Sequence, residues 1–346
     1  MKLAAGVNYG GDPLAASARA VEIERLGIDM LWVPEGYSFD AVSLLGHIAA
    51  RTERIQLASG ILNIYSRTPA LLASTAGGID ALTGGRFNLG LGASGPQVIE
   101  GWHGVPYDRP LQRTREIIDI CRTVWRRELL QHDGPAYQIP LPPGQGTGLG
   151  KPLKLINHPV RSKIPIFLAS LGPKNVQLAA ELADGWFPTF FHPDKAVEVW
   201  GPDLAIGAAR RSPELAPLEI AAGGTVCVTS DTALAQQIRD MARPALALYI
   251  GGMGAKGKNF YNELFRRYGY EQQAAEIQEL YLSGRKREAE ALIPEDYLEA
   301  TTLVGDEGRV KERVQAYREA GVSILSVNVQ GENPLAVVEK LRSWTE

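Results

Sequence analysis

The sequence predicts an α/β protein of the (β/α)8 barrel class, on three observations. Short apolar runs at 30–33, 55–59 and 87–91 each end in a polar or glycine-rich break, followed by sequence able to form a helix or a loop. This rhythm is typical of β/α units with parallel strands, whose functional groups gather where the strands end. The pairs Asp12-Pro13 and Thr68-Pro69 each combine a helix N-cap with a first-turn proline. About eight such units follow one another, the number that the barrel requires.

Each unit can be placed by its apolar run, its cap and its glycine stop. The expected strands are 3–8, 30–33, 55–59, 86–91, 164–169, a short one beginning at 186, 219–228 and 324–329. The expected helices are 13–26, 41–52, 69–82, 113–130, 173–183, 194–210, 232–249, 308–320 and 334–344. The loop 93–110 is expected to hold no helix directly behind the fourth strand.

Two stretches interrupt this order within what we expect to be a single domain over 1–346. Residues 133–162 are rich in glycine and proline and are expected to form a surface excursion. Residues 251–293 carry aromatic and then charged helical sequence, and are expected to form an inserted helical subregion over the barrel mouth.

Composition and charge exclude several classes of function. A net charge of −3 argues against general nucleic-acid binding. Cys121 and Cys227 lie in a helical and a strand-like run, and are expected to be buried free thiols of a protein in a reducing cytosol. No apolar run approaches the length of a membrane span, so a cytoplasmic protein without a membrane is expected. The five histidines form no metal-ligand spacing, and no metal is expected.

Glu35 follows the second strand directly. A carboxylate there is aimed at the barrel mouth, where it could exchange a proton or fix a polar ring edge. A solvated loop glutamate is the alternative. Tyr37 is a weaker candidate for the substrate pocket, and Asp40 is expected to cap the helix that begins at Ala41.

A candidate anion site follows the fifth strand and opens a helix. A proline at the first helical position needs no N–H, and the neighbouring amides point outward at the positive end of the helix dipole, where phosphate is the usual guest. An ordinary strand-to-helix turn is the alternative. The residues are Ser170, Leu171, Gly172, Pro173 and Lys174.

Two other strand ends offer backbone that a ligand can approach closely. Ala93, Ser94 and Gly95 close the fourth strand; glycines 90 to 95 also spell GxGxxG, which we interpret as a false dinucleotide motif. Gly60 and Ile61 follow the third strand, although glycine there can mark only a bulge.

Two polar side chains remain as candidates. Asn8, at the end of the first strand, offers an amide to the same mouth, with a turn-forming role as the alternative. His103, in the loop after the fourth strand, is the one histidine that we expect in a substrate pocket. The absence of a GxSxG elbow, and of GxGxxG after the first strand, disfavours a serine hydrolase and an NAD-type Rossmann fold.

With these residues in place, the chain resembles the luciferase-like monooxygenase superfamily, and more closely its branch of oxidoreductases that depend on the deazaflavin coenzyme F420. The sequence segments that carry the resemblance are WVPEGYSFDAVSLLGHIAARTERIQLASGILNIYSRTPALLA (32–73), TGGRFNLGLGASGPQVIEGWHGVP (83–106) and LGPKNVQLAAELADGWFP (171–188). The insertion 251–293 is the least recognisable part.

The resemblance implies a TIM-type barrel that holds a flavin or deazaflavin ring at the carboxyl ends of the strands. It implies a bulge after the third strand pressed against the ring, with a non-prolyl cis peptide at Gly60-Ile61. It places the coenzyme phosphate near the loop after the fifth strand. Gly36 stands where some relatives have histidine, so the roles of those sugar-phosphate dehydrogenases are not transferred; reductases of pterin-type one-carbon carriers compare more closely.

The function that the resemblance implies is an F420-dependent oxidoreductase that moves hydride to or from a small organic substrate, with Glu35 handling a proton or polarising the ring. An FMN-dependent two-component monooxygenase is the runner-up. A non-catalytic ligand-binding barrel is the alternative from another class. A homodimer is expected by analogy with the superfamily.

Overall fold

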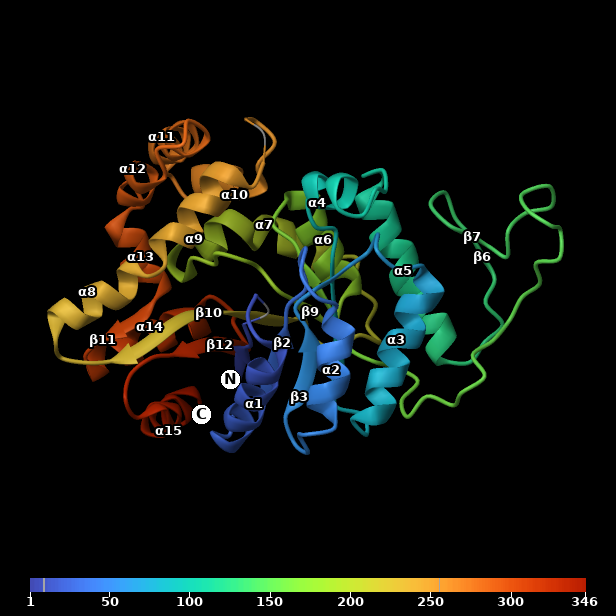
Figure 1. Cartoon of the computed structure of the whole chain (residues 1–346), viewed down its shortest axis with the longest axis horizontal. Helices are drawn as coiled ribbons and strands as arrows, with labels where there is room; N and C mark the ends of the chain where they lie inside the picture. The colour runs from blue at the N-terminus through green and yellow to red at the C-terminus, as the bar shows by residue number, and fades with distance from the viewer. Residues whose placement is uncertain (9, 255) are drawn as a thin grey trace.

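Eight parallel strands close into a barrel, in the order β12, β1, β2, β3, β5, β8, β9 and β10, with β10 returning to β12. The computed structural model describes residues 1–8, 10–254 and 256–346, so position 255 of the expected insertion lies outside the described residues. Two further strands extend the sheet, β4 beside β5 and β11 beside β10. The predicted (β/α)8 barrel is confirmed (Figure 1).

The first half of the barrel follows the predicted order closely. Its strands are β1 (Lys2–Gly6), β2 (Met30–Val33), β3 (Gln56–Ser59), β4 (Leu62–Asn63) and β5 (Phe87–Gly92). Its helices are α1 (Pro13–Arg25), α2 (Ala41–Ala49), α3 (Pro69–Leu82), α4 (Pro96–Gly101) and α5 (Pro110–Trp125). The side chains of Asp12, Asp40 and Thr68 accept hydrogen bonds from first-turn N–H groups, as the cap signals predict.

The second half is more irregular. Its strands are β6 (His132–Asp133), β7 (Gln138–Ile139), β8 (Ile166–Ala169), β9 (Gly185–Trp186), β10 (Glu219–Val228), β11 (Leu303–Gly305) and β12 (Ile324–Val329). Its helices are α6 (Pro173–Leu182), η1 (Pro193–Lys195), α7 (Ala196–Ala208), α8 (Thr232–Asp240), α9 (Arg243–Ala247), η2 (Leu248–Gly252), α10 (Phe260–Arg267), α11 (Glu271–Leu282), α12 (Lys286–Ala291), α13 (Glu295–Thr301), α14 (Glu307–Glu319) and α15 (Pro334–Thr345).

Two expectations about helices are wrong. The single helix expected at 232–249 is broken into α8, α9 and η2, and Pro244, which has no N–H to donate, lies at the start of α9. The loop 93–110 does hold a helix directly behind β5, because Pro96 takes the first position of α4, where its missing N–H costs nothing.

The two stretches that interrupt the barrel differ in where they lie. Residues 133–162 carry little regular structure besides the β6–β7 hairpin and project away from the barrel, on the right of Figure 1. Helices α10, α11 and α12 lie at the top left. The end of α10 meets the loops after β8 and β9, since Arg267 Nη1 donates to the carbonyl of Leu171 (3.3 Å) and the Tyr268 hydroxyl donates to that of Phe190 (2.9 Å).

The barrel interior is filled by a cluster of buried apolar side chains from β1, β2, β3, β8, β10 and β12, so it is a core and not a pore. Trp32 of β2 stacks on Phe187, with ring centroids 4.5 Å apart, and meets the edge of Phe167. These rings form the floor below the carboxyl ends of the strands. The two termini lie side by side at the opposite end, where the Met1 ammonium donates to the carbonyl of Thr345 (2.6 Å).

Candidate active site

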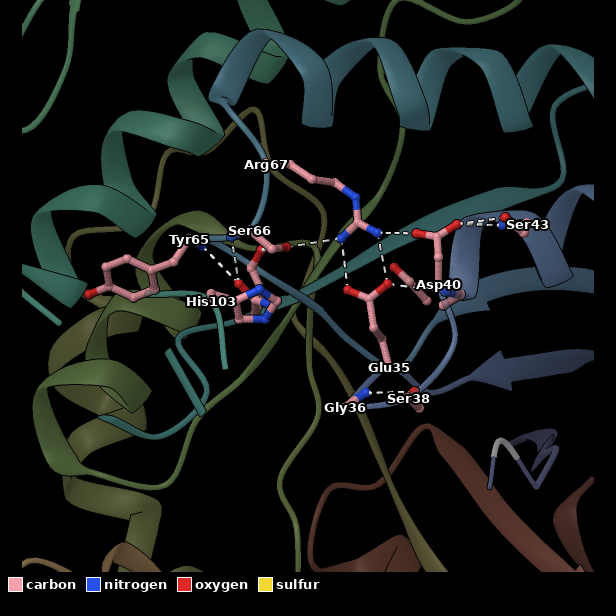
Figure 2. Close-up of polar contacts among 12 residues, drawn as sticks. Glu35, Gly36, Ser38, Asp40, Ser43, Tyr65, Ser66, Arg67 and His103 are labelled. Carbon is pink, nitrogen blue, oxygen red and sulfur yellow. Dashed lines mark hydrogen bonds and ion pairs between the residues drawn. The ribbon is translucent and has the colours of Figure 1, made fainter. Parts of the chain in front are cut away.

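Glu35 leaves the end of β2 and is bound by an arginine that the sequence analysis did not single out. Arg67 donates from Nη1 to Glu35 Oε1 (2.7 Å) and from Nη2 to Oε2 (2.8 Å), and the Ala41 N–H donates to Oε2 (3.1 Å). Only 8% of the Glu35 side chain and 12% of the Arg67 side chain are exposed. Figure 2 shows the Arg67 guanidinium lying between the carboxylates of Glu35 and Asp40. Glu35 is therefore a paired carboxylate and not a solvated loop residue.

Asp40 extends this ion pair to the start of α2. Its carboxylate contacts Arg67 Nη2 and accepts hydrogen bonds from the N–H (2.8 Å) and the hydroxyl (2.9 Å) of Ser43. Burial raises the pKa of the Asp40 carboxyl, but the Ser43 hydrogen bonds and the Arg67 charge outweigh it, so the pKa lies below its usual value. The hydrogen bonds from Arg67 to Glu35 raise the pKa of the Arg67 guanidinium. Burial alone would lower this pKa, but its effect is smaller. The one sequence signal for Arg67 is its place just before the Thr68 cap.

The bulge after β3 has the predicted backbone, since the Gly60–Ile61 peptide bond is cis. Ile61 packs over two glycines of β5: a Cβ atom at Gly92 would lie 2.9 Å from Ile61 Cδ1, and one at Gly90 would lie 3.4 Å from Ile61 Cγ2. A Cβ atom at Gly90 would also lie 1.9 Å from the carbonyl oxygen of Ser59. These glycines of the GxGxxG pattern thus permit close packing inside the barrel. The pattern is no dinucleotide motif, although a helix does follow it.

Asn63, two residues beyond the bulge, links the end of β4 to the predicted pocket residue His103. Its side-chain oxygen accepts from the N–H groups of Tyr65 (3.0 Å) and Ser66 (2.7 Å), and its Nδ2 lies 3.2 Å from His103 Nε2. Figure 2 shows the imidazole beside the turn at Tyr65 and Ser66. The segment 63–67 therefore contacts both predicted residues, His103 through Asn63 and Glu35 through Arg67.

The end of β5 carries the three predicted residues 93–95 in an unusual backbone. Ser94 has φ of +56°, in the left-handed region that a residue with a Cβ rarely adopts. Its hydroxyl-bearing side chain is exposed, and its carbonyl accepts from the Tyr107 hydroxyl (3.4 Å). Ala93 is half-buried beside it, and Gly95 is the N-cap of α4. Such outliers occur often at ligand-binding sites.

The predicted anion site forms the loop between β8 and α6. Gly172 is the N-cap without any side-chain cap, Pro173 takes the first helical position, and Lys174 is exposed at the next. The Ser170 hydroxyl is buried and has no hydrogen-bond partner among the described residues, while the Ser170 carbonyl accepts from Trp186 Nε1 (3.0 Å). Arg267, also missed from the sequence, holds the Leu171 carbonyl at this loop. An unpaired hydroxyl beside an uncapped helix start suits an anion.

Asn8 and Tyr37 lie farther out on the rim. Asn8 is exposed and its side-chain oxygen accepts from the Gly10 N–H (3.0 Å), which fits the turn-forming alternative. It also lines a cavity of about 390 Å³ with Pro34, Phe39 and other residues at the starts of α1 and α2. Tyr37 is 65% exposed.

The described ranges hold no group of three or more metal-binding side chains. Within the same ranges, no helix is long and apolar enough to cross a membrane.

The two cysteines are free and buried, as predicted. Burial raises the pKa of both thiols, and it raises that of Cys121 to about 12.

Comparisons with known proteins agree with this geometry. A protein of Mycobacterium tuberculosis, provisionally named a coenzyme F420-dependent oxidoreductase, is 42% identical over 333 residues, which cover 94% of each chain. The 5,10-methylenetetrahydromethanopterin reductase of Archaeoglobus fulgidus is 28% identical over 307 residues, 87% of this chain and 85% of that protein.

Among solved structures, the coenzyme F420-dependent tetrahydromethanopterin reductase of Methanopyrus kandleri superposes with a TM-score of 0.79 at 20% identity. The match covers 98% of this chain and 96% of the reductase, and it shows the same fold. The family model described as luciferase-like monooxygenase matches residues 1–323. Together with the barrel and the 42% identical relative, this shows that the chain belongs to the luciferase-like monooxygenase family.

Proposed function

We propose that this protein is an oxidoreductase that uses coenzyme F420 and moves hydride between the deazaflavin and a small organic substrate. The observation that carries the proposal is the 42% identity, over nearly the whole chain, to a relative named as F420-dependent. The methylenetetrahydromethanopterin reductase among the relatives supports the same reaction type.

The residues at the barrel mouth fit this coenzyme. Residues 170–174 would hold its phosphate, because the Ser170 hydroxyl is buried without a partner and the first amides of α6 have no capping side chain. Gly60 and Ile61 would lie behind the ring, and Ala93, Ser94 and Gly95 beside it. When bound, the coenzyme supplies a carbon that carries hydride, and the protein must align the substrate carbon at roughly 3–3.5 Å from it.

Glu35 is proposed to act on the coenzyme as a fixed negative charge. Its two oxygens are bound by Arg67 and by the Ala41 N–H, so the carboxylate is held in one position. Of the two roles expected for Glu35, this pairing favours polarising the ring over exchanging a proton, since a proton on Glu35 would break the ion pair.

Titration of the purified protein with F420 and, separately, with FMN tests the proposal by absorbance. We expect saturable binding of F420 and none of FMN. Binding of FMN alone would replace the proposal with a two-component monooxygenase, the activity after which the family is named. Binding of neither coenzyme would favour the non-catalytic barrel.

Two properties of the whole protein complete the proposal. The free buried thiols Cys121 and Cys227 fit the reducing conditions of the cytoplasm, where we place the protein. We also propose a homodimer, since the exposed side of α3 carries no charge and includes Leu71 and Leu82, which are 53% and 69% exposed.

A further inference from the structure

The hydrogen bonds of Asn63 determine which way its amide points. The side chain is buried, and one of its atoms receives the N–H groups of Tyr65 (3.0 Å) and Ser66 (2.7 Å). Backbone N–H groups only donate, so the atom that receives them must be the carbonyl oxygen. The atom 3.2 Å from His103 Nε2 is therefore the Asn63 amide nitrogen, which can only donate.

This orientation selects the tautomer of His103. Because the Asn63 Nδ2 donates, His103 Nε2 must accept and carries no proton. The neutral imidazole then has its proton on Nδ1. An imidazolium, or the other tautomer, would set two N–H groups against each other at this contact.

The Nδ1–H is left available to a ligand. No hydrogen bond of Nδ1 occurs in the described part of the chain, and the ring is only half-buried. The ring is hydrogen-bonded to Asn63, the last residue of β4. Strand β4 follows the Gly60–Ile61 bond directly and pairs with β5 at Leu91 and Gly92. This places the imidazole beside the strand ends at which the coenzyme is proposed to bind.

We infer that His103 is held by Asn63 as a neutral imidazole whose Nδ1–H donates a hydrogen bond to the oxygen of a carbonyl substrate. The second half of this inference rests on the proposed function. When hydride from the bound coenzyme adds to the carbonyl carbon, the π electron pair of C=O moves to the oxygen, and water supplies the proton that completes the alcohol. A donor at that oxygen stabilises the negative charge as it forms. In the reverse direction, the same N–H holds the alcohol oxygen.

The tautomer can be measured without coenzyme or substrate. In protein labelled with 15N at histidine, two-bond 1H–15N spectra at neutral pH should give His103 the pattern of a protonated Nδ1 and an unprotonated Nε2; His103→Gln assigns the signal by its loss. Asn63→Asp keeps an acceptor for Tyr65 and Ser66 but offers a second oxygen to His103, and should therefore move the proton to Nε2. An imidazolium, or Nε2–H in the unmodified protein, would overturn the inference.

The substrate contact is measured with F420 bound and a panel of small ketones and aldehydes as probes. At least one of them should shift the Nδ1 resonance and be reduced by the reduced coenzyme, and His103→Gln should lower kcat/KM for it about tenfold, as expected for one neutral hydrogen bond. His103→Gln should bind F420 normally, as should the control His158→Gln, whose histidine is exposed in the excursion beside Arg127. If no carbonyl probe perturbs Nδ1, the contact is wrong. Failure of F420 to bind would instead refute the proposed function and leave the tautomer result intact.

Discussion

At the scale of single residues, the site depends on charges that are paired before any ligand arrives. Glu35 and Arg67 face each other with two hydrogen bonds and little exposure to water. Such a pair adds little net stability over apolar residues, but losing one partner leaves a charge that water cannot solvate. Its value is geometric, because it connects the loop after β2 to the loop before α3.

Glu35→Gln should therefore destabilise the fold by about 2–3 kcal/mol, somewhat below the usual cost of breaking a buried pair, because Arg67 keeps Asp40. Asp40→Asn is the matched control: its side chain is 46% exposed and asparagine still caps α2, so it should cost less than about 1 kcal/mol. Denaturant unfolding of both variants measures the difference. Equal costs would mean that Arg67 is solvated and that the pair does not order the two loops.

At the scale of elements, α6 illustrates how one helix end can receive an anion. No side chain caps the first amides of α6, and Lys174 adds a charge in the first turn. The opposite end of β8 has a comparable lysine, Lys163, which pairs with Asp184 (3.1 Å). The two lysines stand at opposite ends of β8 and make a matched pair for testing.

Lys174→Gln should weaken F420 binding about two- to fivefold, the value of one charge near a helix N-terminus, and should weaken the competition by inorganic phosphate as well. Lys163→Gln should leave both unchanged, because its side chain lies at the amino end of β8. Fluorescence titration of each variant supplies the affinities. An equal effect of both substitutions would show that only the net charge matters and that the phosphate binds elsewhere.

At the scale of the whole molecule, the exposed side of α3 is a helix surface that carries no charge. The one charged residue of α3, Asp80, is buried and bound by Arg161. Exposed leucines on a surface without charges favour association with another protein surface. In a symmetric dimer, the same face of each subunit would meet its copy.

The double substitution Leu71→Asp with Leu82→Asp should convert a dimer to a monomer, because the carboxylates would be brought together at the two-fold axis. Light scattering coupled to gel filtration gives the mass. Leu149→Asp, at a residue 84% exposed in the excursion, is the control and should leave the mass unchanged. If the unmodified protein is a monomer, the proposed dimer is refuted. If the Leu149→Asp control also becomes a monomer, the dimer interface lies at the excursion and not at α3.

The sequence by itself determined the barrel and the strand ends at which the site is predicted. Apolar runs, caps and glycine stops are local signals, so β10 and β12 fall on their predicted residues and Asp12, Asp40 and Thr68 cap the predicted helices. The segment after Pro96 and the helix around Pro244 were misplaced, because proline is compatible with a helix start as well as with a break.

Only the tertiary structure decided which side chains meet. Arg67 lies 32 residues from Glu35, and Asn63 lies 40 residues from His103. Nothing local in the sequence marks these contacts, because the closed barrel brings the ends of β2, β4 and β5 to one rim. The predicted proton carrier Glu35 is thereby found as a paired carboxylate, and the predicted pocket residue His103 as an imidazole whose tautomer a neighbouring amide selects.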